Sequence, residues 1–285
     1  MQRRFEQVDV FASSPWSGNP LAVVVDGEGL SDDEMHRFAN WTNLSETTFV
    51  LPPTVPGADY RVRIFTTTVE LPFAGHPTLG TCRAWIDHGG RPADADTIVQ
   101  QCGAGLVTIR RDGDRLAFAA PPLVRSGPVD DALRDRIERT LGTAVVDAAW
   151  CDNGPGWVAA LLTSADEVLA LQPDFGDTLD LKLGVVGPVA GSADADRDRD
   201  HDRDHDWEIR AFFPGPTSMQ EDPVTGSLTA SVAQWLMGRD QTLSSYIARQ
   251  GTALGRSGRV HLRRDGDDIW VGGAVTRRVS GHVEL

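Results

Sequence analysis

The chain has 285 residues, of which 40% are hydrophobic and 24% are charged. This length favours two domains, and no apolar run approaches the roughly 18 to 20 residues that a membrane-spanning helix needs. The 41 acidic and 27 basic side chains give a net charge of -14, which makes nucleic acid an unlikely partner. Three widely spaced cysteines, Cys82, Cys102 and Cys151, suggest a reducing compartment, and no export signal precedes them. We therefore expect a cytoplasmic protein.

The first half mixes strands and helices. Residues 7–11 alternate, a Ser-Gly-Asn-Pro turn follows at 17–20, and residues 21–25 return as an apolar strand, which indicates a hairpin-like opening. Ser31 with Glu34 forms a capping box that starts a helix with an apolar face. The β-branched run at 47–50 predicts the next strand, so Glu46 falls at a helix-to-strand junction.

The second half contains the same kinds of element. Asp112-Gly113 predicts a hairpin, Asp130 caps a helix, and Ser164 with Glu167 forms a second capping box. Asp265-Gly266 predicts a late hairpin. The strands and helices do not alternate regularly, which argues against a doubly wound parallel sheet.

Residues 193–206 differ from the rest of the chain. They hold seven aspartates, three arginines and two histidines, with no large apolar side chain. Such a segment cannot bury a core, so we predict a disordered surface insertion. A weak metal site in this tract is the less favoured alternative.

Two distant stretches resemble each other. Glu70-Leu71-Pro72-Phe73-Ala74-Gly75-His76-Pro77-Thr78 aligns without gaps with Glu221-Asp222-Pro223-Val224-Thr225-Gly226-Ser227-Leu228-Thr229, at an offset of 151 residues. A strand-like segment precedes each copy, and an almost uncharged stretch follows each glycine. A helix that is apolar or small on every side is buried all round. The pattern predicts two similar domains, each a curved, mostly antiparallel sheet or barrel around a central helix, and therefore an α+β fold built by duplication.

The start of each buried helix carries amide groups without intrahelical partners and a partial positive charge. Gly75 and Gly226 would let a ligand approach the backbone closely. If the two helix starts face one cleft, they could hold a small carboxylate without a basic side chain. Two simple tight turns before buried helices are the alternative.

We expect the domain boundary between Ala119 and Pro128, where prolines interrupt the pattern. The domains would then span 1–120 and 121–285, and the last strand could return to the first domain.

Taken together, the motifs resemble the PhzF-like proteins of phenazine biosynthesis, which share the two-domain diaminopimelate epimerase fold. The matching motifs are Ser17-Gly18-Asn19-Pro20, Asn43-Leu44-Ser45-Glu46-Thr47, the two repeats above and Gly272-Gly273. The resemblance covers nearly the whole chain and implies a homodimer that isomerises a small carboxylate by proton transfer, without a metal or organic cofactor. In the best understood member the substrate is trans-2,3-dihydro-3-hydroxyanthranilate.

The resemblance also assigns the site residues. Glu46 is the expected acid and base, because a carboxylate in a closed cleft can remove a proton and return it. His76 and Asp222 would orient the substrate or assist proton movement. Asn19, Gly75, Gly226 and Ser227, together with His76, would bind the substrate. For each side chain an ordinary structural role, as a turn, a cap or a surface group, is the alternative.

Other activities have less support. The thiol pair of diaminopimelate epimerases and proline racemases is missing, because the matching positions hold Ala74-Gly75-His76 and Thr225-Gly226-Ser227. No nucleophile-elbow motif surrounds Ser227, which disfavours a hydrolase, and no glycine-rich nucleotide fingerprint follows a strand. The remaining alternative is a binding or scaffold protein that keeps the fold without catalysis.

Overall fold

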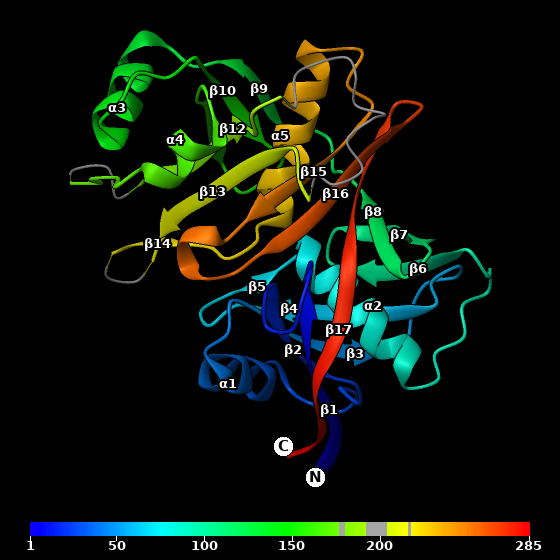
Figure 1. The fold of residues 1–285 in the computed structure, drawn as a ribbon. Coiled ribbons are helices and arrows are strands. Elements are labelled where there is room, and N and C mark those ends of the chain that lie inside the picture. The colour runs from blue at the N-terminus through cyan, green and yellow to red at the C-terminus, as the bar shows by residue number, and fades with distance from the viewer. Residues whose placement is uncertain (177–179, 192–203, 216–217) are drawn as a thin grey trace. The chain divides into compact units, whose positions relative to one another are not determined.

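The computed structural model describes residues 1–176, 180–191, 204–215 and 218–285. Contacts within the chain define two compact units (Figure 1). Unit 1 comprises Met1–Ala119 and Gly272–Leu285, and unit 2 comprises Ala120–Val271. Among the described residues, no helix combines the length and the apolar character required to cross a membrane.

Unit 1 is a closed barrel of eight strands around one helix. Its elements are β1 (Gln2–Val10), β2 (Asn19–Val24), α1 (Asp32–Thr42), β3 (Thr47–Leu51), β4 (Tyr60–Phe65), β5 (Glu70–Leu71), α2 (Gly75–Asp87), β6 (Thr97–Cys102), β7 (Gly105–Asp112), β8 (Arg115–Ala119) and most of β17 (Asp268–Glu284). The strands pair in the cycle β1-β2-β3-β4-β6-β7-β8-β17-β1, which leaves only the short β5 outside the ring. The pairs β2–β3 and β4–β6 are parallel, and the short β5 is antiparallel to β4.

Unit 2 repeats this order of elements. It contains β9 (Arg125–Pro128), α3 (Asp131–Leu141), β10 (Asp147–Asp152), β11 (Trp157–Leu161), α4 (Ala165–Ala170), β12 (Lys182–Pro188), β13 (Trp207–Pro214), β14 (Met219–Glu221), α5 (Gly226–Arg239), β15 (Ser245–Gln250), a 3-10 turn (Thr252–Leu254), β16 (Gly258–Asp265) and the start of β17. The parallel pairs are now β11–β12 and β13–β15, and the short β14 is antiparallel to β13. The sequence of strand, helix and pairing types from β10 onward therefore matches that from β1, which confirms the predicted duplication.

The buried helices explain why each sheet curves. In α2, nine of the residues are buried, including Leu79, Cys82 and Ala84, and α5 is buried to the same extent. A helix without a polar face must be covered on all sides by other elements. The sheet supplies this cover in each unit.

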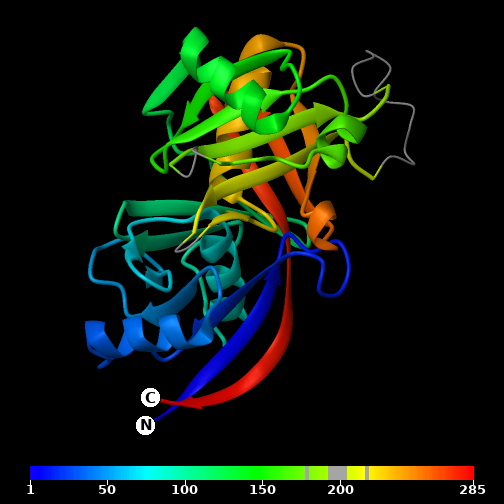
Figure 2. The same ribbon diagram turned by 90° about the vertical axis from the view of Figure 1, so that its left-hand side faces the viewer.

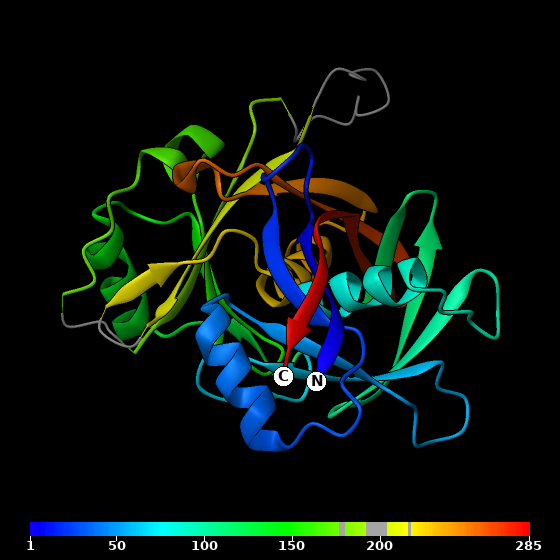
Figure 3. The same cartoon turned by 90° about the horizontal axis from the view of Figure 1, so that it is seen from below.

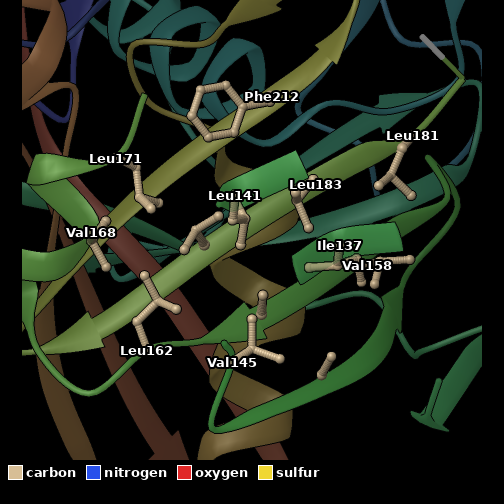
Figure 4. Packing of buried hydrophobic residues seen from close by; sticks show 13 residues of the cluster. Ile137, Leu141, Val145, Val158, Leu162, Val168, Leu171, Leu181, Leu183 and Phe212 are labelled. Atoms are coloured by element: carbon tan, nitrogen blue, oxygen red, sulfur yellow. The ribbon is translucent and has the colours of Figure 1, made fainter. Parts of the chain in front are cut away.

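Unit 2 also carries an apolar layer beneath its surface helices. Ile137 and Leu141 of α3 and Val168 of α4 pack against Val158, Leu183, Val185 and Phe212 of the sheet (Figure 4). Because side chains alternate along a strand, Gly184, between Leu183 and Val185, faces the opposite side, toward Leu228 of α5.

One ion pair is duplicated along with the strands. In unit 1 the Arg63 guanidinium makes two hydrogen bonds to the Glu70 carboxylate, of 2.8 and 2.6 Å, and lies 5.0 Å from the centre of the Phe65 ring. In unit 2 Arg210 makes the same two bonds to Glu221, of 3.0 and 2.8 Å. Arg210 also lies 4.9 Å from the centre of the Phe212 ring. Each arginine therefore fastens the short strand that leads to a buried helix.

The two ends of the chain lie side by side. Strand β1 is antiparallel to β17, with Gln2 opposite Glu284, and the Leu285 N–H donates to the Met1 carbonyl over 3.1 Å (Figures 2 and 3). Strand β17 belongs to both units, because its residues 268–271 are part of unit 2 and its remaining residues are part of unit 1.

The local signals are confirmed with one correction. Ser31 and Glu34 form the predicted reciprocal capping box, and Asp130 caps α3 through the Leu133 N–H. Ser164 also caps its helix, but the Glu167 carboxylate binds the N–H and hydroxyl of Thr163 and not the Ser164 N–H. The threonine one residue earlier offers two donors, so this capping box is not reciprocal.

Most of the acidic tract, residues 193–203, lies outside the described residues, so the prediction of disorder there remains a prediction. The described end of the tract joins unit 2. Asp204 forms an ion pair with the buried Arg259, and the Ile247 N–H donates to the Asp206 carboxylate over 2.8 Å.

We predict that Arg210→Met lowers the free energy of unfolding by about 3 to 5 kcal/mol, because removal of the arginine leaves the buried Glu221 carboxylate without a counter-charge. The Glu221 side chain is only 11% exposed. The carbonyls of Val168 and Leu171, which Arg210 also binds, would lose their donor. Urea unfolding at neutral pH measures the change.

Arg63→Met is the matched control. Its partners Glu70 and Asp32 have side chains that are 42% and 82% exposed, so water replaces the lost contacts. The loss there should be about 1 kcal/mol or less. Equal losses in the two variants would contradict the burial argument.

Candidate active site

Glu46 lies in the short connection between α1 and β3, as the sequence predicts. Helix α1 ends at Thr42, and its C-cap residue Asn43 takes the left-handed conformation with φ of 55°, a conformation that asparagine tolerates well. The hydroxyls of Thr42 and Thr47 are 2.8 Å apart and join the two sides of the turn. Glu46 is thus held between a helix end and a strand start, with its side chain 15% exposed.

His76 is the second residue of α2 and meets Glu46. Its Nε2 atom lies 3.3 Å from Oε2 of Glu46, and its side chain is 6% exposed. Burial lowers the pKa of His76 to about 3, so the imidazole is neutral at pH 7. Unit 1 therefore brings together a carboxylate and a neutral imidazole, two groups able to accept or relay protons.

A buried hydrogen-bond chain fixes the start of α2. The Tyr60 hydroxyl donates to Gln100 over 2.9 Å, the Gln100 amide donates to the Thr78 hydroxyl over 3.0 Å, and that hydroxyl donates to the Ala74 carbonyl over 2.9 Å. No side chain caps the N-terminus of α2. Gly75 is the first residue of this helix, directly before His76.

The start of α5 is held by an equivalent glutamine. The Gln250 amide accepts from the Thr225 N–H over 3.0 Å and donates to the Asp222 carbonyl and the Thr225 hydroxyl, both over 2.9 Å. The Thr225 hydroxyl in turn donates to the Asp222 carboxylate. Asp222 is therefore oriented by a relay that begins at a fully buried side chain.

Ser227 follows Gly226 in the first turn of α5. Its hydroxyl accepts a hydrogen bond of 3.0 Å from the Trp157 indole, and its carbonyl accepts one of 2.9 Å from Asn153. The contact from Trp157 leaves the hydroxyl hydrogen of Ser227 available for another acceptor.

Asn19 is the first residue of β2 and is fully buried. Gly18 before it passes so close to Val10 that a Cβ atom at Gly18 would be 2.1 Å from the Val10 carbonyl oxygen. Only glycine fits there, and the Gly18 N–H donates to the Asp9 carboxylate over 3.0 Å. The close approach fixes where Asn19 enters the barrel.

The predicted site residues are thus divided between the two units. Unit 1 contains Asn19, Glu46, Gly75 and His76, and unit 2 contains Asp222, Gly226 and Ser227. The structure brings Glu46 to His76 in one unit and gathers Asp222 and Ser227 at the start of α5 in the other. That both groups line one cleft remains a prediction.

The cysteines are unsuited to catalysis. Burial raises the pKa of Cys82 and of Cys151 to about 12, and burial also raises the pKa of Cys102. Thiols of this kind are not nucleophiles at neutral pH. Within the described residues, no three His, Cys, Asp or Glu side chains gather as metal ligands.

Sequence reasoning missed Gln100, Gln250 and Trp157. The two glutamines lie 150 residues apart, close to the offset of the repeat, and this spacing could have identified them. Trp157 has no counterpart in the motifs. Its contribution is seen only in the structure, where its indole donates a hydrogen bond to the Ser227 hydroxyl.

Comparison with known proteins identifies the family. Residues 8–280 match the family model of the phenazine biosynthesis-like proteins, PhzC-PhzF. The chain is 34% identical to antisense-enhancing sequence 1 of Schizosaccharomyces pombe, over 98% of each chain. It is 33% identical to trans-2,3-dihydro-3-hydroxyanthranilate isomerase of Pseudomonas aeruginosa, over 92% of this chain and 91% of that one.

Among solved structures, a PhzF-family protein of Enterococcus faecalis superposes over all of both chains, with a TM-score of 0.80 and 25% identity. The duplicated fold, the family match and the isomerase relatives lead to one assignment. The chain belongs to the PhzF-like family of phenazine biosynthesis-like proteins, with the diaminopimelate epimerase-like fold, and it is an isomerase.

Proposed function

We propose that this isomerase shifts a proton within a small unsaturated cyclic carboxylic acid, with Glu46 as the acid and base. The observation that supports this most directly is the 3.3 Å approach of Glu46 to a neutral, buried His76. The relative from Pseudomonas aeruginosa is named for trans-2,3-dihydro-3-hydroxyanthranilate, and we propose a substrate of that kind.

In this proposal Glu46 removes a proton from a saturated ring carbon and the electron pair moves into the adjacent double bonds. The protonated Glu46 then returns the proton to another carbon of the conjugated system. Because one carboxylate does both, removal and return take place on the same face of the ring. The neutral His76 orients Glu46 by a polar contact and can bind an amino or hydroxyl group of the substrate.

Asp222 and Ser227 complete the proposed set. The relay from Gln250 through Thr225 orients the Asp222 carboxylate, which can accept a hydrogen bond from an amino or hydroxyl group of the substrate. The Ser227 hydroxyl can donate to a carboxylate. We assign substrate binding also to Asn19 and to the backbone at Gly75 and Gly226.

We propose in addition that the protein is a homodimer, as the family resemblance implies, and that it is cytoplasmic, as its three widely spaced cysteines suggest. Sedimentation equilibrium of the purified chain tests the dimer.

Glu46→Gln should reduce isomerisation by at least about a hundredfold, because the amide keeps the shape of the side chain but cannot take the proton. Binding of the substrate should change little. Chromatography in deuterated water separates the product from the substrate of equal mass and measures turnover, and mass spectrometry of the separated product measures deuterium uptake. The test compounds are trans-2,3-dihydro-3-hydroxyanthranilate and other small cyclic acids.

Glu28→Gln removes the same charge from an exposed position in unit 1 and should leave turnover unchanged. Wild-type turnover in Glu46→Gln would show that another group is the base. Binding of these acids by the wild-type protein without any exchange would favour the alternative of a binding protein.

Burial of His76 makes the stability of the protein depend on pH. The pKa of His76 is lower in the folded protein, about 3, than its ordinary value of 6.5, so the folded state binds fewer protons between these values. The stability that neutral His76 contributes is complete above pH 6.5 and decreases as the pH falls toward 3. His76→Gln should therefore reduce the slope of unfolding free energy against pH by up to about 1.4 kcal/mol per pH unit in this window.

Urea unfolding at half-unit steps from pH 7 to pH 4 gives the slope. His282→Gln, at an exposed position of β17, is the control. If His76→Gln and wild type have the same slope, His76 is not held neutral by burial.

A further inference from the structure

The sequence contains only one lysine, Lys182, and every other cationic side chain among its 27 lysines and arginines is an arginine. Lys182 is the first residue of β12 in unit 2 and is half-buried.

The duplication gives this position a counterpart. In unit 1 Phe65 lies opposite both Glu70 and Thr47. In unit 2 Phe212 lies opposite both Glu221 and Leu183. Thr47 and Leu183 are therefore equivalent, and the residues before them, Glu46 and Lys182, are equivalent as well. The same alignment matches His76 with Ser227.

The register also shows which way Lys182 faces. Leu183 and Val185 pack outward against α3 and α4, so Lys182 and Gly184 face the opposite side of the sheet. Gly184 confirms this direction, because a Cβ atom there would be 2.5 Å from the Leu228 side chain of α5. Lys182 therefore shares the sheet face that covers α5.

The nearest strand places Lys182 at one end of that helix. Trp157 lies directly beside Lys182 in the parallel pair of β11 and β12, and neighbouring residues in register share a face. The Trp157 indole binds the hydroxyl of Ser227 in the first turn of α5. In the part of the chain that the structure describes, the Lys182 ammonium has neither an ion pair nor a hydrogen bond.

We propose that Lys182 binds the carboxylate of the substrate, and this inference rests on the proposed function. An ammonium group without a counter-charge, on a half-buried lysine, favours an anionic ligand. It also offsets the repulsion that a protein with a net charge of -14 exerts on a carboxylate. The duplicated position thus carries the proton-transfer group in unit 1 and the carboxylate-binding group in unit 2.

Two stable aromatic compounds separate this role from other contacts. The probe 3-hydroxyanthranilate carries amino, hydroxyl and carboxylate groups as trans-2,3-dihydro-3-hydroxyanthranilate does, but it has no hydrogen on the substituted ring carbons and cannot isomerise. The second compound, 2-aminophenol, is the same ring without the carboxylate. Titration calorimetry gives the affinity for both.

Wild-type protein should bind 3-hydroxyanthranilate more tightly than 2-aminophenol, and Lys182→Met should weaken only the first, by about ten- to a hundredfold, the range for a hydrogen bond to a charged group. Lys182→Arg should restore most of the preference. Arg263→Met removes one exposed positive charge from unit 2 and should have no effect. A preference for the carboxylate that survives in Lys182→Met would overturn the proposal.

The single lysine allows a test on the unmutated chain. Reductive methylation with carbon-13 labels only Lys182 and the N-terminal amine and keeps their charge. The Lys182 resonance should shift on addition of 3-hydroxyanthranilate and stay in place with 2-aminophenol. An unchanged resonance at saturation would refute the proposal even if Lys182→Met failed to fold.

The outcomes also separate this inference from the proposed function. If wild-type protein isomerises a carboxylic acid and Lys182→Met keeps the wild-type KM, only the role of Lys182 is wrong. If wild-type protein binds neither compound and isomerises no acid, the proposed substrate class is wrong, and the assignment of Lys182 is refuted with it.

Discussion

The structure depends on one constraint, that a helix with no polar face must be enclosed. Helices α2 and α5 bury most of their residues, and in unit 1 eight strands close into a ring around α2. The first turn of the helix holds His76 in unit 1 and Ser227 in unit 2, and our proposal places the substrate beside both.

The two units share one framework and differ in the residues at the proposed site. The pairs Arg63–Glu70 and Arg210–Glu221 keep the same two hydrogen bonds, and Gln100 and Gln250 both anchor a helix start. These contacts hold the short strand and the loop before each buried helix, so a change in either would displace the helix. Glu46 and Lys182 do not hold a helix start in this way. Glu46 directly precedes β3, and Lys182 is the first residue of β12.

Burial affects His76 and the cysteines differently from Arg210. His76 has lost its charge because the surroundings cannot solvate an imidazolium, and the cysteines are held as thiols for the same reason. Arg210 is nearly as buried but stays paired with a carboxylate and two carbonyls. The arginines before the two motifs are thus structural anchors, occupied by the protein itself.

The sequence by itself determined the duplication, the two buried helices, the caps of α1 and α3 and the position of Glu46 at a helix-to-strand junction, because these follow from local periodicity, turn chemistry and a repeated motif. Only the tertiary structure decided that Glu46 meets His76, that Gln250 orients Asp222 and that Lys182 occupies the position equivalent to Glu46. Those relations join residues tens of positions apart, and strand register, which fixes them, depends on the packing of whole faces and not on any local pattern.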